Sequence, residues 1–314
     1  MLTRRTVILA GREATYGTDP ALGSTNAILA FDIDLDIKGE VLERDVLRDT
    51  LSRMPHVVGM KECSLSFKAE LKGAGLTGTS PTASTDIGLL YSGCGFNTGV
   101  VTGTTLVYSL VSQESEMNSI AFKVEKDGNY HKVLGARGTV KFNLEAGKYG
   151  VVEFEFQGLY DPVTAGTIHD ISGLTENKPP IVYNSSFQIA GFSPVCSAAE
   201  IDIAVGVVRR DNLNAQYGVE GFRLTSRKPM LNFNADAVVE ASNPFWGDWE
   251  GEVVDTFGIQ IGSDPGNIVM FTGHFQYESN KYGDQDGVSK YDCVAALVSS
   301  SSTSKDDELT ITHI

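Results

Sequence analysis

The chain is 314 residues long, which is enough for two domains of ordinary size or for one large all-β domain. Forty Asp and Glu residues against twenty-five Lys and Arg residues give a formal charge of -15, which argues against a protein that grips nucleic-acid phosphates through basic patches. Glycine, with 33 residues, exceeds its usual share of about 7%, while hydrophobic and charged residues are ordinary in number. We therefore expect a globular, turn-rich protein.

Several classes of protein find no support in the sequence. No segment approaches the roughly 18 consecutive apolar residues that a membrane helix needs, and we expect neither a membrane span nor a secretory leader. The four cysteines are scattered singly and the five histidines share no ligand spacing, so neither a metal site nor a cofactor is predicted. No Walker-type, GxSxG or HExxH sequence occurs, and we predict that the chain is not an enzyme.

Period-two alternation dominates the chain and predicts half-buried strands. Residues 31–38 and 64–71 alternate apolar with polar side chains; residues 121–134 predict a hairpin around Asp127-Gly128-Asn129, and residues 140–144 and 151–156 continue the meander. The two best helical candidates, residues 84–92 and 244–249, are short. The predicted fold class is all-β with one or two short helices.

An internal repeat is the most informative feature. Sliding the chain against itself places residues 33–70 over residues 199–236 without a gap, and nine of the aligned positions are identical. We interpret the repeat as a duplication that yields two tandem related domains, each a β-sandwich or barrel-like unit. The Gly- and Thr-rich loop 72–84 falls inside the first, and the Pro-containing stretch 172–180 separates them. The expected division is residues 1–172, a linker over 173–182, and residues 183–314.

Two sets of residues are candidate functional positions. The first is an acidic strand face, Asp34 and Asp36, which the second repeat retains as Glu200 and Asp202. A calcium loop is a poor interpretation of the first strand, because Ile37 stands where that loop needs glycine. The second is an Arg-Asp pair at equivalent places in both repeats, Arg44 with Asp45 and Arg210 with Asp211, which fits either a contact between subunits or a local salt bridge.

Two further motifs have ordinary explanations. The glycines of residues 73–78 have dinucleotide-fingerprint spacing, but Thr, Ser and Pro81 follow where a helix should begin, so a loop is expected. The aromatic cluster of Phe245, Trp246 and Trp249 fits a packed corner or a subunit contact better than a sugar-stacking platform.

The chain resembles the tail tube proteins of long-tailed bacteriophages over nearly its whole length. The resemblance rests on residues 11–20, 26–29, 41–47, 135–138 and 151–160 in the first half, and on residues 210–215 and 227–229 in the second. It implies a structural virion protein whose domains join into rings, and whose rings stack into the hollow tube through which phage DNA is ejected. The protein would be made in the host bacterial cytoplasm and reside in the virion.

The resemblance also shapes the expected assembly. With two tandem domains, three chains would complete a ring with six-fold pseudosymmetry; a hexamer of chains is the alternative. Asp34, Asp36, Glu200 and Asp202 would then form an acidic bore or inter-domain face, past which DNA moves without tight binding. The N-terminal arm through Pro20, the loop 72–84 and residues 299–307 are candidate ring-to-ring contacts. Tape measure, tail terminator and distal tail proteins are the implied partners.

Two other functions are alternatives to a tail tube. The first is a two-domain β-sandwich that binds carbohydrate or protein, and the second is a hydrolase on a jelly-roll scaffold.

Overall fold

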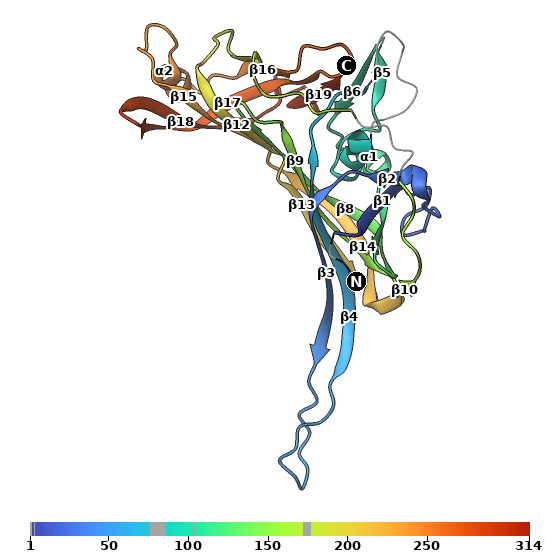
Figure 1. Ribbon diagram of the computed structural model, residues 1–314. Helices are drawn as coiled ribbons and strands as arrows, with labels where there is room; N and C mark the ends of the chain where they lie inside the picture. The colour runs from blue at the N-terminus through green and yellow to red at the C-terminus, as the bar shows by residue number, and fades with distance from the viewer. Residues whose placement is uncertain (1, 3, 76–85, 103, 172–176) are drawn as a thin grey trace.

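The computed structural model describes residues 2, 4–75, 86–102, 104–171 and 177–314. It confirms the all-β prediction, because antiparallel strands make up most of the described chain (Figure 1). The two α-helices of the described chain are short: α1 covers Asp86–Gly93 and α2 covers Phe245–Glu250, each close to a predicted helix. Three single turns of 3-10 helix complete the helical part, at Ser24–Asn26, Glu114–Glu116 and Gln216–Gly218.

Eight strands form one continuous antiparallel layer that runs through both halves of the chain. In spatial order they are β3 (Phe31–Leu42), β4 (Val57–Glu70), β9 (Val151–Tyr160), β8 (Asn129–Glu145), β12 (Cys196–Asp202), β15 (Met230–Asp236), β18 (Val288–Leu297) and β17 (Val269–Gln285). One face of this layer carries the apolar side chains of the alternating pattern, and the other carries the polar ones. β8 and β12 meet where the first half of the chain joins the second.

A second layer covers the apolar face. It contains β1 (Thr6–Arg12), β2 (Ala27–Ile28), β7 (Ile120–Lys126), β5 (Val100–Thr102), β6 (Thr105–Ser109), β19 (Leu309–His313), β16 (Asp255–Ile261) and β11 (Ser186–Ile189). The short β10 (Thr164–Ala165) pairs with the start of β8. The long strands β8 and β17 begin in this second layer, beside β7 and β16, and end in the first.

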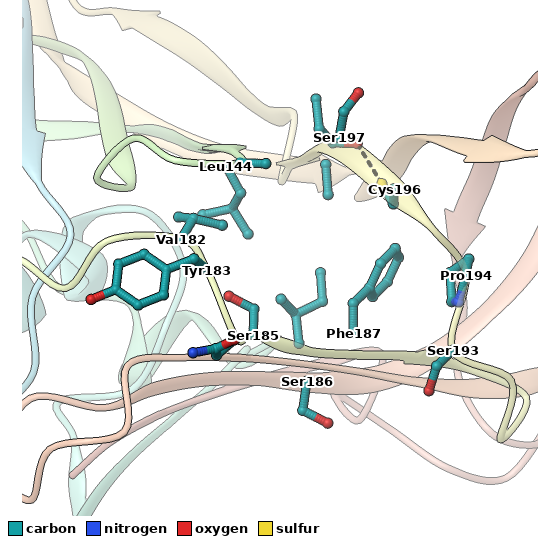
Figure 2. Close-up of a pocket in the computed structure, with 15 residues that line it drawn as sticks. Leu144, Val182, Tyr183, Ser185, Ser186, Phe187, Ser193, Pro194, Cys196 and Ser197 are labelled. Carbon is teal, nitrogen blue, oxygen red and sulfur yellow. Dashed lines mark hydrogen bonds between the residues drawn. The ribbon is translucent and has the colours of Figure 1, made fainter. Parts of the chain in front are cut away.

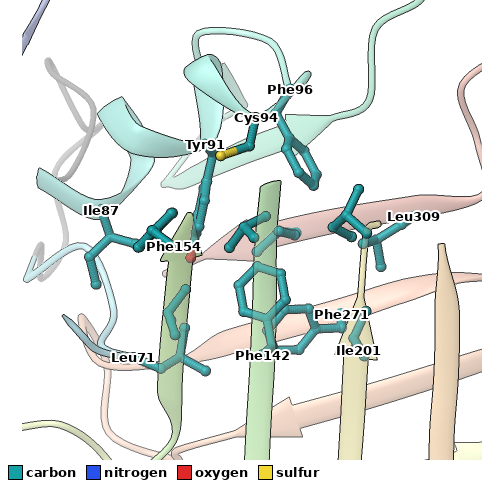
Figure 3. Close-up of a cluster of buried hydrophobic side chains, with 14 of the residues drawn as sticks. Leu71, Ile87, Tyr91, Cys94, Phe96, Phe142, Phe154, Ile201, Phe271 and Leu309 are labelled. Carbon is teal, nitrogen blue, oxygen red and sulfur yellow. The ribbon is translucent and has the colours of Figure 1, made fainter. Parts of the chain in front are cut away.

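Apolar side chains from both halves fill the space between the layers (Figure 3). The ring of Phe142 in β8 lies 4.9 Å from that of Phe271 in β17, and Tyr91 of α1 packs on Phe142 at 5.7 Å. The C-terminal strand β19 pairs with β17 on one side and with β6 of the first half on the other. The halves therefore share one core, and the division at residues 172–182, partly outside the described residues, stays a prediction.

The two halves have the same strand order. The first runs β3-β4-β9-β8-β7-β1 and the second runs β12-β15-β18-β17-β16-β11. Each half also places its α-helix between the third and fourth of these strands along the chain: α1 follows β4 and precedes β7, and α2 follows β15 and precedes β16. The equivalence extends well beyond the segments 33–70 and 199–236 in which the sequence displays the repeat.

Each half has a hairpin arm that leaves its sheet. In the first half, β3 and β4 extend together far beyond the sheet, with residues 43–56 at the tip (Figure 1). In the second half, the corresponding arm is the two-stranded sheet of β13 (Val205–Asp211) and β14 (Val219–Arg227). This second arm does not project freely, because it packs against β4, β8 and β9 of the first half.

Candidate functional site: the polar face and open edges of the sheet

The polar face of the eight-stranded layer carries many carboxylates. In β9, Glu153 and Glu155 alternate with Val152 and Phe154, which are buried. Cross-strand pairing then aligns residues of different strands on one face, because directly opposite residues point the same way. Asp34 lies opposite Ser66, and Ser66 lies opposite Glu155, so the acidic residues of β3 and β9 occupy the same face.

The structure separates the four predicted acidic residues into two pairs. Asp34 and Asp36 are exposed on β3, at the outer edge of the layer. Glu200 and Asp202 lie on β12, at the junction of the two halves, where Asp202 is opposite Lys141 of β8. The Lys141 Nζ is 2.8 Å from the Glu200 Oε2, and this hydrogen-bonded ion pair raises the pKa of Lys141 against the opposing effect of burial. Glu200 and Asp202 therefore belong to an inter-half contact.

The apolar side of this junction is closed. Ile201 and Ile203 of the second half and Phe142 of the first half are fully buried, with exposed fractions of 0%.

Lys141, the partner of Glu200, is not among the residues that the sequence predicts. Its place opposite an acidic strand depends on the pairing of strands that lie far apart in the sequence, which no local pattern displays.

The same layer has two open edges, one at each end. Among the described residues, β3 pairs with β4 alone, and residues 281–285 of β17 pair with β18 alone. Apolar and aromatic side chains on these edges are exposed: Ile37 of β3 is 38% exposed and Tyr282 of β17 is 66% exposed. Open strand edges with exposed apolar side chains are surfaces that pair with further strands.

The Arg-Asp pairs occupy different environments in the two arms. Arg44 and Asp45 are exposed at the tip of the first arm, whereas the corresponding residues of the second arm form local ion pairs. The Arg210 Nη1 lies 3.4 Å from the Glu220 Oε1 across the β13–β14 hairpin, and the Asp211 Oδ1 accepts a hydrogen bond from the Nε of Arg209 at 2.8 Å.

The neighbouring Arg209 makes the contact between halves. Its Nη1 lies 2.9 Å from the Glu62 Oε2 of β4, so one guanidinium joins the second arm to the first half. A search for identical residues in the repeat misses this contact, because Arg209 aligns with Glu43.

Tyr16 fastens the second arm to the first half. Its hydroxyl accepts a hydrogen bond from the backbone N–H of Phe222 at 2.7 Å and donates one to the carbonyl of Gly135 at 2.9 Å. Burial is the largest cause of the raised pKa of this phenol, which keeps it a neutral donor. Nearby, the Tyr217 ring packs on that of Tyr160 at 5.4 Å and receives the Lys61 ammonium at 4.9 Å from its centre. The second arm is thus held by aromatic, ionic and hydrogen-bonded contacts.

A cavity of about 470 Å³ opens beside the junction, between β12 and residues 182–187 (Figure 2). Its described lining combines apolar side chains with Tyr183, Asn184, Cys196 and several serines, and contains no charged residue. The Cys196 thiol donates to the Ala198 carbonyl, and burial raises its pKa, so the sulfur is held as a neutral thiol. The cavity offers neither an acid-base pair nor an activated nucleophile.

The aromatic cluster is a packed corner. Phe245 is fully buried, and Trp246 stacks on Tyr282 with ring centres 5.5 Å apart. The rings of Trp246 and Trp249 stand 87° apart, so they form no shared flat platform for a sugar.

Over the described part of the chain, no group of three or more His, Cys, Asp or Glu side chains is placed to hold a metal ion. None of the helices described is long and apolar enough to cross a membrane.

Comparison with known proteins identifies the family of the chain. A search of the curated proteins found no match. A family model described as phage tail tube protein matches residues 3–249, which is well over half of the chain. The β3 edge, the β8–β12 junction and both arms fall inside this match. The chain therefore belongs to the phage tail tube protein family, a structural component of the phage tail.

Proposed function

We propose that the chain assembles edge to edge into a ring of three copies, and that rings stack into the hollow tube through which phage DNA leaves the virion. The observation that carries the proposal is the eight-stranded layer, which has an open edge at each end and a closed junction between its two halves in the middle. A ring removes both open edges, because each edge finds the opposite edge of the next copy.

The repeated strand order supports a ring of three copies. Each chain supplies two units with equivalent strands, so three chains supply six such units around a ring. Eight strands from each of three chains make a closed barrel of twenty-four strands. A ring of six chains is the alternative count.

The acidic polar face supports a bore that DNA crosses without sticking. Once the apolar face is covered by the second layer, the polar face with Glu153, Glu155, Asp34 and Asp36 is the surface left to line the ring. Carboxylates along the bore repel phosphates, and the net charge of -15 per chain has the same sign. Arg44 and Asp45, exposed at the arm tip, are proposed contacts to another copy, whereas Arg210 and Asp211 stabilise the second arm.

The remaining partners are proposed from family membership. Tape measure, tail terminator and distal tail proteins would contact the lumen and the two ends of the tube, and the chain would be made in the host cytoplasm before it enters the virion.

The experiment is a mass measurement on the purified protein at increasing concentration, with negative-stain microscopy of the same sample. We expect rings or tubes whose smallest closed unit has the mass of three chains of 33.8 kDa each. A closed unit of twice that mass would replace the trimer by a hexamer. A chain that stays monomeric at all concentrations, and also when seeded with assembled tail tips, would contradict self-assembly.

A further inference from the structure

Resting on the proposed ring, we propose that the contact between copies repeats, residue for residue, the junction inside the chain. The open edge of β17 in one copy pairs antiparallel with the open edge of β3 in the next, as β8 pairs with β12. The register places Lys281 opposite Asp36, Tyr282 opposite Leu35 and Gly283 opposite Asp34. The occupant of each edge is therefore a second copy of this chain.

β3 in the first half of the chain is equivalent to β12 in the second half. The alignment of residues 33–70 with residues 199–236 also matches the strand pairing. Residues that lie opposite each other in the β3–β4 hairpin align with residues that lie opposite each other in the second half. Leu35 opposite Leu65 becomes Ile201 opposite Leu231, and Val41 opposite Val58 becomes Val207 opposite Leu224. Both hairpins also slip in register just before Val41 and Val207, respectively. The edge of β3 therefore has the shape of the edge of β12.

β8 in the first half of the chain is equivalent to β17 in the second half. The pairing of Leu65 with Phe156 becomes that of Leu231 with Ala295, which fixes Ala295 of β18 as the counterpart of Phe156 in β9. The same offset carries Val152 onto Tyr291. Because Val152 lies opposite Phe142 and Tyr291 lies opposite Tyr282, Tyr282 occupies the position of Phe142. Lys281 then occupies that of Lys141.

The exposed fractions of equivalent side chains agree with a contact between copies that repeats the internal junction. Phe142 and Ile203, which lie on the two sides of the internal junction, are 0% exposed. Their counterparts at the open edges, Tyr282 and Ile37, are 66% and 38% exposed. The same positions are closed inside the chain and open at its ends, which is expected if a neighbouring copy completes them.

The charges agree as well. Lys141 bridges Glu200 at the internal junction, and the transferred pair is Lys281 with Asp34, again a cation with a carboxylate. The arms give a second pair: Arg209 bridges Glu62 inside the chain, and the equivalent positions are Glu43 and Lys228. The acidic residue now stands on the arm and the basic residue on the sheet, the reverse of the internal pair, so the two residues still attract each other. We therefore assign Lys228 of one copy to Glu43 of the next, whose β3 pairs with β17 of the first.

A disulfide tests the register. Opposite residues of antiparallel strands have Cα atoms about 4.5–5.5 Å apart, within reach of a disulfide. Inside one chain Leu35 and Tyr282 lie on opposite ends of eight strands, about 34 Å apart at the usual strand spacing, so a bond between them joins copies. The Leu35→Cys/Tyr282→Cys variant should give covalent ladders ending at closed trimers under mild oxidation. The Leu35→Cys/Lys281→Cys variant is the matched control, because its second thiol points to the other face.

Charge exchange tests the ion pairs. Lys281→Asp alone and the pair Asp34→Lys/Asp36→Lys alone should each raise the protein concentration needed for rings by about tenfold, because Lys281 faces both carboxylates. Combining the three changes should restore assembly. Glu43→Lys, Lys228→Glu and their combination should behave likewise. The melting temperature of the monomer, measured at low concentration, should stay constant in all of them.

The outcomes separate this inference from the proposed function. Two results would overturn the register and leave ring formation standing. In one, the Leu35→Cys/Tyr282→Cys variant forms rings but its introduced thiols stay reduced; in the other, the Leu35→Cys/Lys281→Cys control cross-links equally well. A wild-type chain that never associates would overturn both. We expect cross-linking in the Leu35→Cys/Tyr282→Cys variant, and restored assembly when the charge changes on the two sides are combined.

Discussion

His313 is a buried base whose protonation should control stability in mild acid. Its ring packs on those of Tyr91 and Tyr108, and its Nδ1 is 3.0 Å from the carbonyl of Lys72. Burial lowers the pKa of His313 to about 4, against about 6.5 in an unfolded chain. Since the folded form resists protonation, its stability is complete above pH 6.5 and falls as the pH drops toward 4.

We expect this one histidine to cost about 2 kcal/mol of unfolding free energy between pH 7 and pH 5. Urea unfolding of the wild type and of His313→Gln at both pH values measures it, because glutamine does not titrate. A pH slope that is equal in the two proteins would show that other groups cause the loss.

Tyr16 supports a second prediction, because a single hydroxyl joins the N-terminal segment, β8 and the second arm. Tyr16→Phe keeps the ring but leaves the Phe222 N–H and the Gly135 carbonyl without this partner. We expect a loss of about 1–3 kcal/mol in the free energy of unfolding, with the oligomeric state of the folded protein unchanged. Tyr183→Phe, at a tyrosine that is 61% exposed, is the control and should cost nothing measurable.

Among the elements, the strands were predictable and their partners were not. The alternation in residues 31–38 marks β3 because one face of the layer is buried, and the ungapped repeat correctly matches β3–β4 with β12–β15. The same alternation cannot show that the arm of the second half lies on β4, because Tyr217 and Arg209 meet Lys61 and Glu62, which lie far earlier in the chain. The corresponding first arm stays free in a single chain.

The docked arm predicts which tip residue of the free arm matters. Leu51 aligns with Tyr217, which packs on Tyr160 and Lys61, whereas Leu47 aligns with Leu213, which is 104% exposed even in the docked arm. Leu51→Ser should therefore raise the protein concentration needed for rings by about tenfold, because the variant loses the free energy of burying much of a leucine side chain. Leu47→Ser should form rings like the wild type, and equal effects of the two changes would contradict the transfer. Light scattering across a dilution series measures both.

At the scale of the whole molecule, the composition indicates the sign of the charge on the proposed bore, and the strand pairing indicates which face would line it. The acidic balance was readable from the sequence, but which carboxylates share a face depends on the register of distant strands. Glu200 and Asp202 lie on the polar face at the β8–β12 junction, where Lys141 opposes them, and Glu155, which no motif marks, is exposed on the same face beside Ser66. Charge composition is a property of the whole chain, and the position of each charge is a property of the fold.

Glu155→Lys changes the charge of every chain by two units at the proposed bore, and Glu250→Lys makes the same change on the exposed side of α2. Tubes of the wild type and of Glu250→Lys should release short duplex DNA at physiological salt. Tubes of Glu155→Lys should retain it, with retention falling steeply as salt rises, because each lysine-phosphate contact releases counterions. Equal retention by the two variants would place Glu155 away from the DNA path.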